Sequence, residues 1–306
     1  MERRSFHDEI GRNRRSSILL IVILTLIVVV LAATISYTFA PEYLIVVLLL
    51  SLIFMLAYSY GSYMYGDQVV LSATKARPAD EREHLFLRDT VEGLSLAAGV
   101  PAPKVYVVPS EEVNAFATGR DPEHASVAVT TGLMSVLDRE EMEGVLAHEL
   151  SHIRNRDVSF MTLVAVLVGL AAILSHVIRR TYRFRGVSRG RRGGRRDRER
   201  GAGIEATILA LGFFLAIFAP LLTRMVQFAI SRQREYLADA SGVELTRYSG
   251  GLASALEKIM GHNRGEMDVS EAVSHLFFVD PNRSALDSLY ATHPPIDERI
   301  KRLKAM

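Results

Sequence analysis

His148-Glu149-Leu150-Ser151-His152 forms an H-E-x-x-H motif in a segment that the sequence pattern predicts to be helical. Residues four apart share one face of a helix, so the two histidines can bind one metal ion together. Glu149 lies one step round the helix, beside the metal, where a base for a zinc-bound water is needed. The motif therefore predicts a zinc site with Glu149 as the catalytic base.

The residues before the motif favour a helix. Asp138 is a suitable N-cap, and Glu141 follows three positions later as its partner in a capping box. The apolar residues recur at helical spacing, and the two histidines are offset from most of this stripe: Met142, Val145, Leu146, Leu150 and Ile153. The alternative is an ordinary amphipathic helix whose histidines happen to lie four apart, and the capping signals argue against it.

A catalytic zinc site needs a third protein ligand. The sixth position after His152 holds Val158, which excludes the class that takes a third histidine there. A later segment contains Glu235 and Asp239, again four apart. We expect Glu235 to bind the metal, and Asp239 to accept a hydrogen bond from the far ring nitrogen of a ligand histidine. The alternative is a solvated acidic face on a surface helix.

Four motifs together resemble the HtpX-type membrane zinc metalloproteases, which are gluzincins, and more distantly the CAAX prenyl endoproteases. They are Asn114-Ala115-Phe116-Ala117-Thr118-Gly119, His148-Glu149-x-x-His152, Glu235-x-x-x-Asp239 and His293-Pro294-Pro295. The resemblance covers nearly the whole chain. It implies a zincin-like catalytic domain with a small sheet beside two ligand helices, a cytosolic site and a histidine, His293, near that site.

The composition indicates a membrane protein. Hydrophobic residues make up 49% of the 306 residues, and mean hydropathy is +0.18. The absence of cysteine excludes disulfides and thiolate zinc ligands. Net charge is +2, but 11 arginines and only two acidic residues lie in 179–203, so the basic excess belongs to one loop.

Four apolar segments predict transmembrane helices: 18–39, 43–65, 158–178 and 206–230. A cleaved signal peptide is the alternative for the first, and buried core helices are the alternative for the last two. Each pair forms a hairpin, and the second hairpin returns the chain to the side that it left. Glu235 should therefore reach the side that holds both histidines.

These segments divide the chain into five parts. They are a basic N-terminal segment (1–17), a transmembrane hairpin (18–65), a first catalytic part (66–157), a second hairpin with the Arg-rich loop (158–230) and a second catalytic part (231–306). The catalytic parts are predicted to form a mostly helical α+β domain. Its expected helices run near 79–98, 251–262 and 295–304, and its expected strands are 104–108, 113–118 and 126–131.

The positive-inside count slightly favours a multi-pass protein of the cell (plasma) membrane with its catalytic domain in the cytosol, and five N-terminal arginines support this. The Arg-rich loop 179–203 conflicts with that orientation unless it is translocated despite its charge or its hairpin does not fully cross. The loop can contact anionic lipid headgroups. We expect no nucleic acid, because aromatic or fold support is missing.

The predicted reaction is hydrolysis of peptide bonds in misfolded or membrane proteins, in quality control and stress response, with one Zn²⁺ per chain. Glu149 moves the proton, and His293 is the candidate donor to the oxyanion, unless it caps the last helix. Asn114, Ala115 and Phe116 are expected to form a strand edge that pairs with the substrate backbone; a turn-capping Asn114 is the alternative.

Asp157 has two interpretations. It either orients His152 or is an ordinary helix-end residue beside Arg154 and Arg156.

Two competing functions remain at this stage. One is site-specific processing of the prenyl-endoprotease type, and the other is a non-enzymatic, lipid-binding membrane scaffold that uses the Arg-rich loop. The variant Glu149→Gln separates the scaffold from the proteases, because only a protease loses its function with this substitution.

Overall fold

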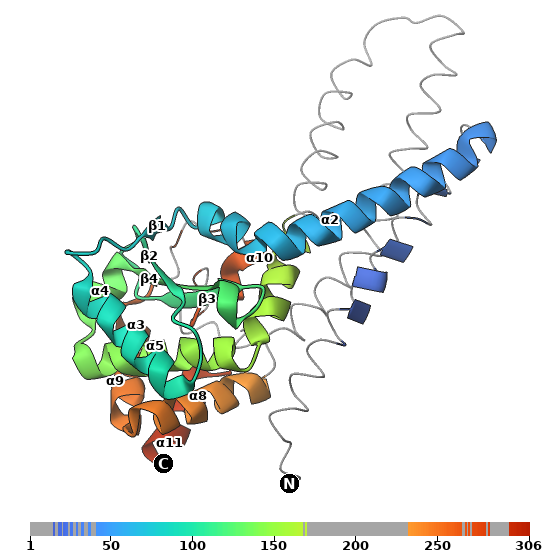
Figure 1. Cartoon of the computed structure of the whole chain (residues 1–306). Coiled ribbons are helices and arrows are strands. Elements are labelled where there is room, and N and C mark those ends of the chain that lie inside the picture. The colour runs from blue at the N-terminus through green and yellow to red at the C-terminus, as the bar shows by residue number, and fades with distance from the viewer. Residues whose placement is uncertain are drawn as a thin grey trace, which may run out of the picture.

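The computed structural model describes residues 41–167, 232–264 and 294–306 without interruption, together with position 169 and parts of 15–37 and 267–281 (Figure 1). The Arg-rich loop, the predicted span 206–230 and His293 lie outside these residues, as does part of the predicted span 18–39. The predicted span 158–178 is described as far as Leu167, in the apolar helix Asp157–Leu167.

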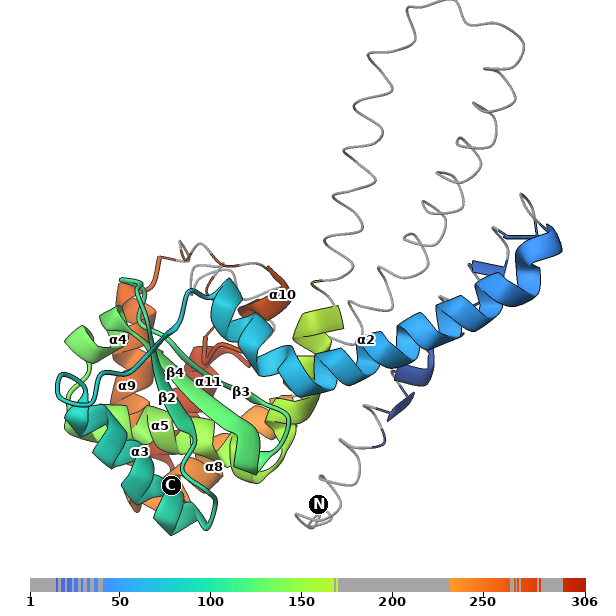
Figure 2. The same ribbon diagram turned by 45° about the horizontal axis from the view of Figure 1, so that its top comes forward.

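A long helix projects from the domain. The 3₁₀ turn η1 (Pro41–Tyr43) leads into α2 (Leu44–Ala73), whose 30 residues extend about 45 Å (Figures 1 and 2). Its first half exposes large apolar side chains, among them Ile45, Ile53 and Leu56. Within the described residues, α2 is the one helix long and apolar enough to cross a membrane, and it contains the predicted span 43–65 apart from its first residue. The other three predicted spans lie wholly or partly outside the described residues.

A mixed four-stranded sheet forms one layer of the domain. Its order is β1 (Arg77–Pro78), β2 (Lys104–Val108), β4 (Ala125–Thr130) and β3 (Ala115–Gly119). The pair β2–β4 is parallel, whereas β1–β2 and β4–β3 are antiparallel. The three predicted strands are confirmed: β2 has the predicted bounds, and the bounds of β3 and β4 differ by one or two residues. Strand β1 was not predicted, because two residues carry no alternating pattern.

The first predicted helix starts later than expected. Helix α3 is Leu85–Ala98 rather than 79–98. The backbone N–H of Ala79 donates to Val105 of the sheet, and the Asp80 carboxylate accepts from the next turn, which keeps this stretch out of the helix. The helix ends as predicted at Ala98, because Gly99 follows with a φ of 70°, in the left-handed region that glycine tolerates.

The helix that carries the H-E-x-x-H motif is the centre of the domain. Helix α5 (Arg139–Arg154) begins at Asp138, and both hydrogen bonds of the predicted capping box with Glu141 are present. Glu141 is buried and also accepts from Lys258 and Ser254 of α9 (Ser249–His262), which ties the start of α5 to its neighbour. Of its 16 residues 12 are buried, so α5 is a core helix rather than an amphipathic surface helix.

Helices enclose α5 on the side away from the sheet. It contacts α8 (Arg232–Thr246), α9 and α3, with strand β3 on its other side (Figure 2). Gly144 permits the close approach of α9, because a Cβ there would lie 2.7 Å from the backbone nitrogen of Leu252. The C-terminal α11 (Ile296–Lys304) packs against α9 and α8, close to the metal-binding motifs.

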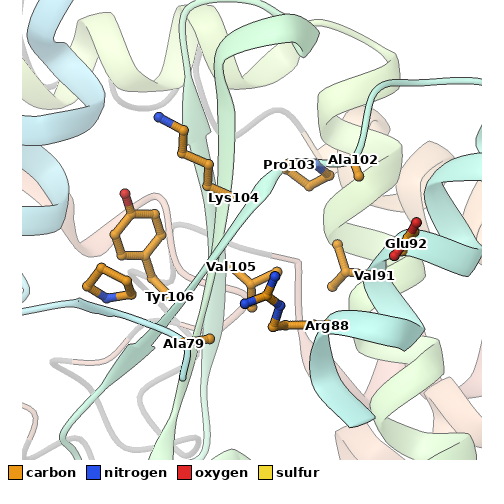
Figure 3. A pocket seen from close by; sticks show the side chains of 10 residues that line it. Ala79, Arg88, Val91, Glu92, Ala102, Pro103, Lys104, Val105 and Tyr106 are labelled. Atoms are coloured by element: carbon orange, nitrogen blue, oxygen red, sulfur yellow. The ribbon is translucent and has the colours of Figure 1, made fainter. Parts of the chain in front are cut away.

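Shorter elements complete the fold: η2 (Pro122–His124), α4 (Thr131–Val136) and α10 (Glu271–Ser274). A second apolar cluster joins the sheet to α2 and to helix Asp157–Leu167, with Phe116 and Phe277 at 4.8 Å between ring centroids. A pocket of about 430 Å³ lies between β2 and α3 (Figure 3). Its polar lining residues, Arg88, Glu92, Lys104 and Tyr106, include none of the predicted metal ligands.

Candidate metal centre

Three predicted ligands converge in the core. His148 and His152 come from α5, and Glu235 comes from the first turn of α8. The Nε2 atoms of the two histidines are 3.2 Å apart. Oε2 of Glu235 lies 3.7 Å from Nε2 of His148, and Oε1 lies 3.6 Å from Nε2 of His152. All three side chains are at most 6% exposed. These are the residues that the sequence predicted, and Glu235 joins the two histidines from 83 positions beyond His152.

A carboxylate holds the other nitrogen of each imidazole. Nδ1 of His148 lies 2.9 Å from Oδ1 of Asp239, and Nδ1 of His152 lies 3.1 Å from Oδ2 of Asp157. Each Nδ1 can therefore place its hydrogen on a carboxylate, which leaves the two Nε2 atoms to face each other. At 3.2 Å these two nitrogens need a cation between them, which is either a proton on His152, in line with its raised pKa, or a metal ion.

The spacing fits a small divalent cation. Nitrogen and carboxylate ligands lie about 2.0–2.2 Å from zinc, so neighbouring ligands of a tetrahedral site are about 3.3 Å apart. The three observed separations are 3.2, 3.6 and 3.7 Å. A donor set of two imidazoles and one carboxylate, without any thiolate, is also that of known catalytic zinc sites.

Glu149 lies beside this group and does not join it. Its carboxylate is 2% exposed and accepts a hydrogen bond from the backbone N–H of Ala117 on β3. Burial raises the pKa of Glu149 to about 7, against the opposing charge of His152. A carboxyl group with a pKa near neutrality can both take up and return a proton at physiological pH.

The two histidines differ in their electrostatic surroundings. Burial lowers the pKa of His148 to about 4, and the nearby charge of Arg299 contributes in the same direction. Burial also acts to lower the pKa of His152, but the hydrogen bond to Asp157 and the charge of Glu235 raise it to about 9. The pKa of Asp239 falls to about 2 despite its burial, because Arg299 and His148 stabilise its charged form.

Comparison with known proteins agrees with this geometry. Residues 81–306 match peptidase family M48. The chain belongs to peptidase family M48. It is 46% identical over 254 residues to a protease HtpX homolog of Caldanaerobacter subterraneus subsp. tengcongensis, covering 83% of each chain. A protease HtpX homolog of Thermoanaerobacter pseudethanolicus is 47% identical over 254 residues, again with 83% of each chain covered.

More distant matches follow. A protease HtpX homolog of Listeria monocytogenes is 42% identical over 246 residues, covering 79% of this chain and 81% of that one. Among solved structures, the crystal structure of S. mikatae Ste24p matches with a TM-score of 0.48 and 18% identity, covering 97% of this chain and 66% of that one. The family match and the HtpX relatives confirm the resemblance found in the sequence, and this M48 protein is a membrane-bound metalloprotease that acts on protein substrates.

The structure brings to this M48 centre one residue that the sequence did not reveal. Arg299 of α11 is completely buried, and its guanidinium binds Asp239 through Nε at 3.0 Å and through Nη2 at 2.7 Å. It also lies over the ring of Phe278, 4.6 Å from the centroid. In the sequence, Arg299 stands in a charged C-terminal helix and looks like one more solvated arginine; only its position four residues after Pro295 links it to a motif.

Of the predicted substrate-binding residues, Ala115 and Phe116 lie on β3, and Asn114 directly precedes this strand. Asn114 is fully buried, and its side-chain amide donates to the carbonyl of Val279 while its side-chain oxygen accepts the N–H of Val279. The carbonyl of Ala115 accepts from the N–H of Phe278, and Phe116 forms a β-bridge with Phe277. In this structure the chain's own residues 277–279 therefore occupy this half of the strand edge.

Of the remaining candidates, Asp157 contacts His152 at 3.1 Å, which favours the interpretation that it orients this histidine. His293 lies outside the described residues, although Pro294 and Pro295 directly precede α11.

Proposed function

We propose that this M48 protease is a zinc endopeptidase of cellular protein quality control, cleaving misfolded or membrane proteins in the cytosol beside the bilayer. One Zn²⁺ is held by His148, His152 and Glu235. The observation that carries the proposal is the meeting of these three donors at 3.2–3.7 Å, with Glu149 beside them in a buried site.

The chain's own residues supply the proton chemistry. Zinc, when bound, polarises the scissile carbonyl and acidifies a water molecule. Glu149 takes the proton from the attacking water and later returns it to the leaving amine, and the N–H of Ala117 keeps its carboxylate in place. His293 is our candidate for donating a hydrogen bond to the oxyanion, with Pro294 and Pro295 stiffening its backbone.

Asp239 and Asp157 act through the histidines. Each accepts the Nδ1–H of one imidazole and so turns the Nε2 lone pair of that imidazole toward the metal. Because buried carboxylates accept these hydrogen bonds, each ring is also a stronger ligand for a metal than it would be in the same site without its carboxylate.

The substrate contact is proposed for the edge of β3. Backbone groups two residues apart face the same side of a strand, so Ala117 presents its carbonyl on the edge that Ala115 shares with Phe278. Since residues 277–279 already cover Asn114, Ala115 and Phe116, we place the pairing of the substrate backbone next to Ala117. Recognition of backbone rather than side chains predicts a loose sequence preference.

The membrane boundary is proposed to lie near the tyrosines of α2. Tyr60, Tyr63 and Tyr65 are more than half exposed, and Tyr63 and Tyr65 point to opposite sides of the helix. These tyrosines follow the exposed apolar half of α2, and tyrosines on several sides of a helix are typical of the headgroup level of a bilayer. We further propose a multi-pass plasma-membrane protein with a cytosolic site, whose loop 179–203 contacts anionic headgroups.

Site-specific processing and the scaffold remain less favoured. Membership of the M48 family supports a protease over a scaffold. No observation at the described site points to a prenylated substrate, so we do not adopt that alternative.

The test compares the detergent-purified, zinc-loaded parent with Glu149→Gln on an unfolded, fluorescently labelled reporter protein. General base catalysis contributes about 10²–10⁴-fold, so the variant should lose at least about 100-fold in rate. Glu143→Gln is the matched control, because Glu143 is an exposed residue of the same helix and should keep the parent's rate. Equal digestion by the parent and Glu149→Gln would contradict the mechanism.

A further inference from the structure

The most deeply buried charge in the described domain belongs to Arg299. Among the described residues, Arg299 is the largest side chain that is fully buried, with 0% exposure. It lies in the first half of α11. Burying a guanidinium is costly unless every donor finds a partner. Its partners therefore indicate what the residue is for.

The first partner is Asp239, which the guanidinium grips at both oxygens. Nε donates to Oδ2 at 3.0 Å and Nη2 donates to Oδ1 at 2.7 Å, a two-point contact that fixes the plane of the carboxylate. Oδ1 is also the atom that lies 2.9 Å from Nδ1 of His148. The orientation of the first imidazole thus depends on a carboxylate that Arg299 holds.

The second set of partners surrounds the same imidazole. Nη1 lies 3.7 Å from Oε2 of Glu235, the third predicted ligand, and 3.4 Å from the carbonyl of Phe278. The Phe278 ring stacks under the guanidinium and meets the His148 ring edge-on, with 4.9 Å between ring centroids. Arg299 thus contacts the third predicted ligand, Glu235, and the carboxylate partner of His148, Asp239. It also contacts Phe278, which packs against the His148 ring.

The charges around Arg299 also indicate a role at the metal centre. Glu149, Glu235 and Asp239 are buried close together, and like charges at such a site repel one another. The guanidinium offsets this repulsion, because its positive charge contacts both oxygens of Asp239 and lies 3.7 Å from Glu235. Lysine carries the same charge, but as a single point it cannot bind both oxygens of a carboxylate in one plane.

We infer that Arg299 is a positioning residue of the metal centre, which acts through Asp239 on His148 and directly on Glu235. It is not a catalytic residue, since its donors are taken up by the protein. This inference rests on the proposed zinc site. It predicts that Arg299 controls how tightly zinc is held, before any substrate binds.

The experiment measures the zinc dissociation constant of the full-length protein in detergent by competition with a chelator. Partners of this kind change metal affinity by about 10–100-fold, so Arg299→Lys should weaken zinc binding by at least about 10-fold and Arg299→Met by more. The matched controls are Arg302→Lys and Arg302→Met. Arg302 belongs to the same helix but stacks on Tyr236 at half exposure, and its variants should keep the parent's affinity.

A double variant tests the route through Asp239. If Arg299 acts through this carboxylate, adding Arg299→Lys to Asp239→Asn should weaken zinc binding much less than Arg299→Lys does in the parent. Arg299→Lys preserves charge and length, and circular dichroism of the metal-free protein checks its fold, so the comparison does not depend on the methionine variant.

Two results separate the inference from the proposed function. If Arg299→Lys binds zinc like the parent but loses peptidase activity, Arg299 acts on the substrate and the inference is overturned. If the parent itself fails to bind zinc, the proposed function fails first, whatever Arg299 does.

Discussion

The buried carboxyl of Glu149 makes the stability of the metal-free protein depend on pH. Its pKa is about 7 in the folded protein, against 4.5 for an ordinary glutamate. A raised carboxyl pKa means that the folded state favours the protonated form, so this stabilising contribution is present below pH 4.5 and is lost as the pH rises toward 7. Glutamine has the same shape and never ionises, so Glu149→Gln should escape the loss.

The magnitude follows from the shift in pKa. A difference of about 2.5 units at about 1.4 kcal/mol per unit gives about 3 kcal/mol, most of which develops between pH 5 and pH 8. In the presence of a chelator, Glu149→Gln should therefore gain about 2–3 kcal/mol of unfolding free energy over the parent between these two values. Saturating zinc should reduce the gain, because a nearby cation favours the ionised carboxylate.

Urea unfolding in a mild detergent measures the difference. The chain has no tryptophan and 11 tyrosines, so circular dichroism or tyrosine fluorescence reports the transition. Glu143→Gln, on the exposed side of α5, should show no pH-dependent difference from the parent. If Glu149→Gln differs from the parent by the same amount at pH 5 and at pH 8, then Glu149 is not held in a site that disfavours its charge.

Two further predictions concern a ligand partner and helix packing. Asp157→Ala should weaken zinc binding by about 10–100-fold in a chelator competition, because His152 loses the carboxylate that orients it; unchanged affinity would assign Asp157 to the helix end alone. Gly144→Ala should destabilise the fold by about 1–3 kcal/mol, because the new Cβ would meet backbone of α9. Gly93 has open space around it, so Gly93→Ala should stabilise α3 by about 0.5–1 kcal/mol. Thermal unfolding that ranks the two variants the other way would contradict this packing.

The sequence predicted the local features of the site well. The start of α5 was visible because Asp138 and Glu141 satisfy the free N–H groups of a helix end, a purely local requirement. Glu235 was found by combining helical spacing with the return of the chain through a hairpin. The three longer strands were visible for the same reason, since β-branched residues and their spacing are read over a few positions.

Features that depend on the assembled fold were missed. Arg299 could not be distinguished from Arg302 in the sequence, because burial is decided by the packing of α11 against α8 and α9. The occupation of the β3 edge by residues 277–279 depends on a contact across 165 positions between Asn114 and Val279. The late start of α3 reflects pairing of Ala79 with the sheet, another long-range effect that overrides local helix propensity.

The central claim is that two imidazoles and one remote carboxylate hold a single zinc ion. Elemental analysis of the purified protein tests it most directly, in the parent, in Glu235→Ala and in Glu244→Ala, which replaces an exposed residue of the same helix. The parent and Glu244→Ala should each carry about one zinc ion per chain, whereas Glu235→Ala should carry almost none, because two ligands hold zinc far less tightly than three. A parent without zinc, or a Glu235→Ala variant that retains a full complement, would contradict the account.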